Sequence, residues 1–227
     1  MGRRYLVGVF AFQYFMKLLL LLLLPLISYL PVSKPAPVRV TFSPLTKAAY
    51  LAAKKACVST KPQFIFPLKK QKGRIVIPTV KGPKIFQDKG RDEDDAEQER
   101  FQYLGYQPLF RCHLLKIIYY ESAEYLLIDA AGKQLPLCGE PLFSPDMRHI
   151  AASSMGIEYG GGQPNMIQLL ELRGGSVRQV WYLEPKTWEP HRICWTSSST
   201  MYLMQEQCER DGHYSPSRFT YKKLVIE

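Results

Sequence analysis

The 227-residue sequence predicts a mainly β protein, an antiparallel meander or compact sandwich with one short N-terminal helix and a signal or anchor helix before it. Two observations lead to this fold class. After residue 100, short runs of aromatic and β-branched residues recur every 8–14 residues and are separated by polar turns, as in antiparallel sheets. Before that, a leucine run, a Pro-rich stretch and an acidic run divide the chain into residues 1–36, 37–100 and 101–227.

The N-terminal segment is typical of a targeting sequence. Lys17 is followed by seven leucines, Leu18 to Leu24, which is the pattern of a secretory signal peptide that begins at Met16. If translation begins at Met1 instead, residues 5–32 form one mostly apolar stretch that is long enough to span a bilayer. No A-x-A-like cleavage site follows the leucines. We therefore expect export to the periplasm or the cell exterior, with a retained N-terminal membrane anchor as the alternative.

The second segment is predicted to contain a helix and short strands. Ser43 can cap a helix and Pro44 fits its first turn, and alanines continue the helical pattern to Ala56. Three apolar runs bounded by Pro or Gly predict strands at residues 64–66, 74–77 and 84–86.

The third segment is dense in strand signals. Gly132 lies in the turn of a predicted hairpin that joins residues 124–129 to residues 134–137. We expect strands at residues 101–106, 109–120, 124–129, 134–137, 149–153, 166–172, 177–183, 192–196, 200–205 and 219–226.

One stretch of this segment resembles a known family. Residues 141–152 read Pro-Leu-Phe-Ser-Pro-Asp-Met-Arg-His-Ile-Ala-Ala and resemble the Phe-Ser-Pro-Asp-Gly-Lys-x-Ile-Ala signature of TolB-like (WD40-like) β-propeller blades. Met147 stands where the signature has glycine. A second stretch, from Trp188 to Tyr202, resembles a blade more weakly and lies one blade-length further along the chain.

The resemblance covers about residues 125–205, and it implies propeller-like blades in an exported protein of bacterial type. Residues 101–227 suffice for about three blades, whereas closed propellers have at least four. We therefore expect a propeller-like meander or a compact sandwich rather than a complete ring. Because propellers bind ligands as often as they catalyse, the resemblance does not assign a function.

Net charge is concentrated in the second segment. Residues 39–91 hold 13 Lys or Arg and one acid, Asp88, and an acidic linker ending at residue 100 follows. Such a segment can mark an anionic lipid surface, an acidic polymer or nucleic acid as the partner, although a solvated lysine-rich surface is the simplest interpretation. Export argues against nucleic acid.

The cysteines are compatible with an exported protein. Oxidising compartments permit disulfides, but spacing alone does not give their connectivity. We expect one disulfide among the last four of the five cysteines, Cys112, Cys138, Cys194 and Cys208. No Cys-x-x-Cys motif indicates a zinc knuckle or a thioredoxin-like site.

No local motif predicts a reaction. The four histidines, His113, His149, His191 and His213, have no metal-ligand spacing, and no serine stands in a Gly-x-Ser-x-Gly context. We therefore name no catalytic, metal-binding or cofactor-binding residue, and we expect no cofactor.

Three tryptophans seven residues apart are the best candidates for a contact surface. If exposed, Trp181, Trp188 and Trp195 could stack on a sugar or peptide, although tryptophans of an alternating sheet more often fill the core. Because successive strand residues point to opposite faces, either Trp181 or Tyr182 must face outward or into a second layer. The predicted surface is therefore Trp181, Tyr182, Trp188 and Trp195.

Together, these observations favour an exported, non-enzymatic binding module for a protein or polymer. One alternative is an exported hydrolase whose active site is assembled from distant His, Asp and Ser residues. Another is a membrane-tethered accessory protein whose basic segment lies on anionic lipid. In that case, neutralising Lys69, Lys70 and Lys72 should abolish salt-sensitive binding to liposomes.

Overall fold

The computed structural model describes residues 38–58, 60, 65, 68–90, 97–120, 122–157, 163–173, 176–208 and 218–227. The chain divides into two compact units, Met1–Pro37 and Val38–Glu227, and all described residues belong to the second. The predicted signal or anchor helix lies outside the described residues. Within the part of the chain that is described, no helix has the length and apolar character needed to cross a membrane.

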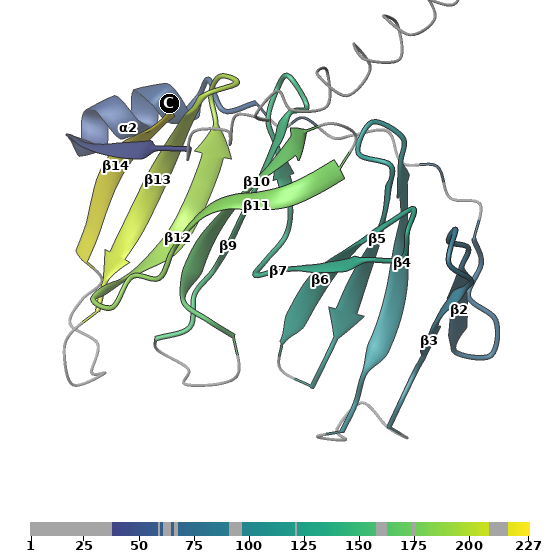
Figure 1. The fold of residues 1–227 in the computed structure, drawn as a ribbon. Coiled ribbons are helices and arrows are strands. Elements are labelled where there is room, and N and C mark those ends of the chain that lie inside the picture. The colour runs from purple at the N-terminus through teal and green to yellow at the C-terminus, as the bar shows by residue number, and fades with distance from the viewer. Residues whose placement is uncertain are drawn as a thin grey trace, which may run out of the picture. The chain divides into compact units, whose positions relative to one another are not determined.

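The second unit is mainly β and antiparallel, as the sequence predicts, and its described part contains a single helix (Figure 1). Its strands form four sheets. The hairpin sheet consists of β2 (Arg74–Ile77) and β3 (Lys84–Gln87). The second sheet consists of β4 (Arg100–Gln107), β5 (Cys112–Ile118), β6 (Ala123–Asp129) and β7 (Gln134–Leu137).

The other two sheets follow in chain order, except for one strand. The third sheet consists of β8 (Leu142–Phe143), β9 (His149–Ser154), β10 (Met166–Arg173) and β11 (Ser176–Leu183). The fourth sheet consists of β12 (Trp188–Trp195), β13 (Thr200–Gln207), β14 (Arg218–Ile226) and β1 (Val40–Leu45). The strand β1 thus comes from the start of the unit and pairs with the last strand.

Successive sheets pack against each other, with a separate apolar core at each interface. Alternation along the strands explains this, since neighbouring residues of a strand point to opposite faces. The first core joins the hairpin sheet to the second sheet through Ile75, Ile77, Phe86, Phe101, Leu115, Ile117, Leu126 and Ile128. The third core joins the third sheet to the fourth through Ala151, Ile167, Leu169, Ile193, Trp195, Met201, Leu203 and Leu224.

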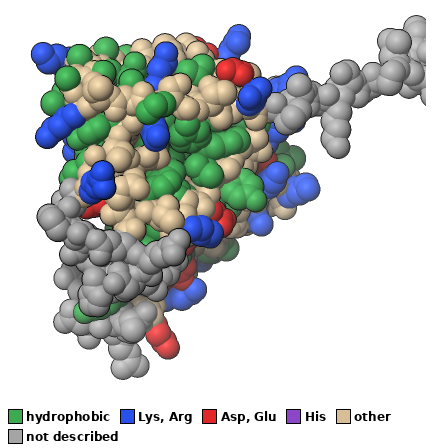
Figure 2. All heavy atoms as spheres, turned by 90° about the vertical axis from the view of Figure 1, so that its left-hand side faces the viewer, with side chains coloured by type: hydrophobic (Ala, Val, Ile, Leu, Met, Phe, Trp, Pro, Cys, Tyr) green, Lys and Arg blue, Asp and Glu red, His purple; other side chains and the backbone are tan. Residues whose placement is uncertain are grey.

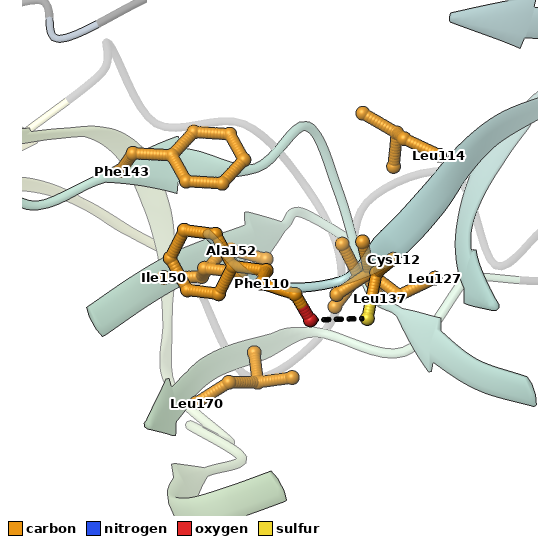
Figure 3. Close-up of a cluster of buried hydrophobic side chains, with 9 residues drawn as sticks. All are labelled: Phe110, Cys112, Leu114, Leu127, Leu137, Phe143, Ile150, Ala152 and Leu170. Carbon is orange, nitrogen blue, oxygen red and sulfur yellow. Dashed lines mark hydrogen bonds between the residues drawn. The ribbon is translucent and has the colours of Figure 1, made fainter. Parts of the chain in front are cut away.

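The core between the second and third sheets is drawn in Figure 3. It contains Phe110, Cys112, Leu114, Leu127, Leu137, Phe143, Ile150, Ala152 and Leu170. The rings of Phe110 and Phe143 meet edge to face, with their centroids 5.4 Å apart. The Cys112 thiol donates a hydrogen bond to the carbonyl oxygen of Phe110 at 3.1 Å. The second and third sheets are therefore covered on both faces.

The helix starts later than the sequence predicts. Ser43 and Pro44 lie in β1, where they pair with Lys223 and Lys222 of β14. The helix α2 (Lys47–Lys54) begins after Thr46, whose hydroxyl accepts a hydrogen bond from the Ala49 N–H at 3.1 Å. Strand pairing with β14 satisfies the backbone of Ser43, so Thr46 takes the capping role instead.

Most predicted strands are present with ends that differ by a few residues. Residues 74–77 and 134–137 agree at both ends. The predicted strand 109–120 is shortened at its start because Leu109 to Arg111 form a turn. Of the predicted strand 64–66, Ile65 makes an isolated bridge to Tyr106, and its two neighbours lie outside the described residues.

Candidate anion-binding site

Two loops of neighbouring sheets meet at a pocket, which we call the lysine pocket. One loop connects β2 to β3, and the other connects β6 to β7. The Val80 N–H donates to the carbonyl oxygen of Ala130 at 2.8 Å and so ties the loops together. The pocket has a volume of about 480 Å³ and is lined by Lys81, Gly82, Pro83, Lys84, Ala131, Gly132 and Lys133.

Glycine is required in the second loop of this pocket. Gly132 has a φ of +80°, which side chains other than glycine rarely adopt. A Cβ atom at Gly132 would lie 3.0 Å from both the Lys84 Cε and the Thr79 Oγ1. The Asp129 carboxylate also fixes this loop, since it accepts a hydrogen bond from the Lys133 N–H at 2.8 Å. The turn therefore lets the Lys84 side chain lie close against the backbone.

The electrostatics of the lysine pocket favour an anion. Its lining carries three ammonium groups, and none of the described lining residues is acidic. Ammonium groups bind carboxylates, sulfates and phosphates through charge-assisted hydrogen bonds. The lining offers no imidazole, thiol or carboxylate for proton transfer or nucleophilic attack. The described lining therefore offers cationic groups to a bound anion.

A second pocket combines lysines with aromatic rings, and we call it the aromatic pocket. It has a volume of about 540 Å³ and lies where β1, α2 and β14 meet, lined by Pro44, Leu45, Lys47, Phe219, Thr220, Tyr221 and Lys222. The ring of Tyr221 packs against Tyr50 of α2, with centroids 4.6 Å apart and the ring planes tilted by 31°. None of the described residues that line this pocket is acidic either.

Figure 2 shows the side of the molecule on which β1, α2 and β14 lie in Figure 1. Hydrophobic side chains gather in the middle of this face, and Lys and Arg side chains stand around them, with few Asp or Glu among the coloured residues. Aromatic rings flanked by cations can stack on sugar rings while binding their acidic substituents.

The predicted tryptophan surface does not form as a unit. Trp195 is 1% exposed, and its indole N–H donates to the carbonyl oxygen of Leu142 at 2.9 Å. Trp181 and Trp188 are half-buried and pack against the core between the third and fourth sheets. Tyr182 is 56% exposed, so it faces outward while Trp181 faces inward. Trp195 is thus a core residue, and only Tyr182 presents a large exposed surface.

The disulfide includes Cys57, which lies outside the expected group of four cysteines. Cys194 pairs with Cys57, with their Cα atoms 5.7 Å apart, so the expected pairing within the last four cysteines is wrong. Cys112, Cys138 and Cys208 take no part in this disulfide. Burial raises the pKa of the Cys112 thiol to about 12 and that of Cys138 to about 11. The bridge joins the chain after α2 to β12, a contact that cysteine spacing cannot reveal.

The Ser-Pro-Asp motif caps a tight turn. Ser144 is fully buried; its hydroxyl donates to the Asp146 carboxylate at 2.7 Å and accepts from the His149 backbone N–H at 2.9 Å. Met147, which replaces the glycine of the resembled signature, has a φ of +58°. Burial lowers the pKa of the His149 ring, and the charges of Asp146 and Glu171 oppose this shift. Although Ser, Asp and His meet here, their bonds stabilise the turn and leave no free nucleophile.

The other histidine with a shifted pKa lies near the first core. His113 is buried, and its Nδ1 lies 2.8 Å from the Tyr103 hydroxyl. Burial lowers the pKa of His113 and raises that of Tyr103 to about 12. Among the described residues, no group of three or more His, Cys, Asp or Glu could hold a metal ion.

The lysines of the pocket were not singled out by sequence. Lys81 and Lys84 belong to the basic segment, but Lys133 lies beyond the acidic linker. Only the contact between the two loops brings Lys133 to them. No family model, curated protein or solved structure matches this chain.

Proposed function

We propose that the unit Val38–Glu227 is a non-enzymatic module of an exported protein and binds an acidic polysaccharide. The observation that carries this proposal is the lysine pocket, in which Lys81, Lys84 and Lys133 line one hollow with no acidic residue among its described lining. Export, which the leucine run favours, would give the module access to polymers outside the cell.

The aromatic pocket supports a sugar-containing ligand. Phe219 and Tyr221 contribute aromatic side chains to its lining, and Lys47 and Lys222 contribute charge. Two cationic pockets on one module suit a polymer with repeated anionic groups, because simultaneous contacts raise the apparent affinity.

The proposed module is built from propeller-like blades. Three four-stranded antiparallel sheets follow one another, and β1 from the start of the unit completes the last of them. Such completion of the last blade by an N-terminal strand, together with the Ser-Pro-Asp turn, favours the TolB-like interpretation over a sandwich. On this proposal the pockets are formed by loops and edges of an open series of blades.

Binding of dextran sulfate and of neutral dextran to the full chain tests the proposed function. The two polymers share a backbone and differ in charge, so wild type should bind the sulfated form only. The triple variant Lys81→Gln, Lys84→Gln, Lys133→Gln should bind dextran sulfate about tenfold or more weakly, because each lost ion pair contributes up to about 1 kcal/mol.

A matched control removes the same charge elsewhere. Arg148→Gln, Arg173→Gln, Lys186→Gln alters three exposed basic residues that line neither pocket, just before β9, at the end of β10 and in the turn before β12. This control should retain affinity within about twofold if the pocket is specific. Equal losses in both triple variants would show that net charge alone attracts the polymer and would overturn the proposed site.

A further inference from the structure

The hairpin sheet has one apolar face that no other described element covers. Ile75 and Ile77 of β2 point into the first core and are fully buried. On the opposite face, Val76 pairs directly with Ile85 across the two strands, and these side chains are 41% and 50% exposed. Val80, in the loop that connects the strands, is 86% exposed. Three aliphatic side chains of one hairpin are thus open to solvent, which costs free energy unless a partner covers them.

Cations surround these aliphatic side chains. Residues 68–90 carry seven Lys or Arg and one acid, Asp88. That acid is already bonded, since its carboxylate pairs with Lys70 and accepts from the Phe101 N–H at 2.9 Å. The exposed basic residues of the hairpin lie at both of its ends: Lys72 and Arg74 at one, and Lys81 at the other.

The position of Lys70 changes the lipid alternative that the sequence suggested. Its ammonium group forms the ion pair with Asp88 and donates to the carbonyl oxygen of Phe101 at 3.0 Å, so it holds the hairpin on the second sheet. Neutralising Lys70 would therefore disturb the fold as well as any lipid contact. The exposed aliphatic face provides a cleaner location for that contact.

We infer that the outer face of β2 and β3 docks on an anionic phospholipid surface. Aliphatic side chains flanked by Lys and Arg match the boundary between acyl chains and anionic headgroups, where each favourable charge adds to the burial of apolar area. An acidic polysaccharide would use the cations but would leave Val76, Val80 and Ile85 in water. The inference does not depend on the ligand of the lysine pocket.

A tryptophan placed at Val80 reports on this contact in the full chain. Val80 contributes its backbone N–H to the fold while its side chain is exposed, so Val80→Trp should fold normally. The probe is a vesicle of phosphatidylglycerol and phosphatidylcholine in which the acyl chains carry bromine, a quencher of indole emission. Insertion of the loop to the headgroup boundary should quench about half of the added emission. Vesicles of phosphatidylcholine alone should quench little of it.

Tyr182→Trp is the matched control, because Tyr182 is an exposed aromatic of the third sheet. Its added emission should not be quenched. The leucine run is present in both variants, so binding through that run cannot produce the difference. Adding Val76→Ser and Ile85→Ser to Val80→Trp should reduce the quenching severalfold while leaving dextran sulfate binding unchanged.

Three results would overturn the inference. The first is no quenching of Val80→Trp by anionic vesicles, and the second is equal quenching of both tryptophan variants. The third is an emission shift of Val80→Trp that appears without vesicles as protein concentration rises. That shift would assign the face to a second copy of the chain.

Discussion

Side chains alternate between two faces in both the third sheet and the hairpin sheet, but the third sheet is buried on both faces and the hairpin sheet on only one. In β10, Leu169 faces the fourth sheet and Leu170 faces the second sheet, and both are fully buried. In β2, Ile77 is fully buried while its neighbour Val76 is 41% exposed. A sheet with a neighbouring sheet on each side buries the apolar side chains of both its faces. The hairpin sheet has a neighbour on one side only among the described residues, and this leaves it a face for a partner.

The largest expected effect is a difference in unfolding free energy between a substitution in the third sheet and one in the hairpin sheet. Leu169→Ala should lower the free energy of unfolding by about 2–5 kcal/mol, because it removes packed atoms and leaves a cavity. Ile85→Ala, on the open face of the hairpin, should cost under about 1 kcal/mol. Urea unfolding of both variants measures the difference. Similar losses would mean that the face of Ile85 is covered in the isolated protein.

The disulfide stabilises the fourth sheet, at the other end of the series of sheets from the hairpin. The double variant Cys57→Ser, Cys194→Ser should lose about 2–4 kcal/mol of unfolding free energy, because the bridge closes a long loop in the unfolded chain. Alkylation of the unfolded, unreduced protein should modify Cys112, Cys138 and Cys208, and prior reduction should expose the other two cysteines. Modification of Cys57 without reduction would contradict the pairing.

The turn of the third sheet offers a smaller effect. Met147 holds a left-handed backbone conformation, with a φ of +58°. Its partly buried side chain packs against the core between the second and third sheets. Met147→Ala and Met147→Gly both remove that packing, but only glycine relieves the backbone. We expect the glycine variant to be more stable than the alanine variant by about 1 kcal/mol. Thermal unfolding of the pair measures it, and an alanine variant of equal stability would rule out strain at this turn.

Acid should weaken the second and third sheets through buried His113 and half-buried His149. Burial lowers the pKa values of His113 and His149, so the unfolded chain binds their protons more readily than the folded one. Stability should therefore fall as pH drops below the ordinary histidine pKa of about 6.5 and continue to fall to the lowered values. Unfolding of wild type and of His113→Gln, His149→Gln between pH 7 and 5 checks this. An equal pH dependence in both would assign the effect to other groups.

Local patterns explain why so much of the strand content could be predicted. The runs at residues 166–172 and 219–226 predict strands within a residue of β10 and β14, because short apolar runs between polar turns favour strands. The prediction that Ser43 caps the helix is wrong because of a tertiary contact. Ser43 and Thr46 are both good caps, and only the pairing of β1 with β14 decides between them.

The candidate site was harder to predict, because its members are distant in sequence. Lys84 and Lys133 line one pocket only after the loop of the hairpin sheet has met the β6–β7 turn. Nothing in the sequence around Trp195 distinguishes a buried tryptophan from an exposed one. The packing of the fourth sheet on the third buries it. The exposure of a side chain depends on its neighbours across an interface.

The sequence by itself determined the strand positions, the turn glycine Gly132, the basic segment and the expectation of export, because each depends on residues that are close together along the chain. The tertiary structure alone decided the order of the sheets, the Cys57–Cys194 bridge, the lysine pocket and the bare face of the hairpin. These features depend on contacts between segments that are distant in sequence. Such contacts form only when the chain folds and buries apolar faces against one another, away from water.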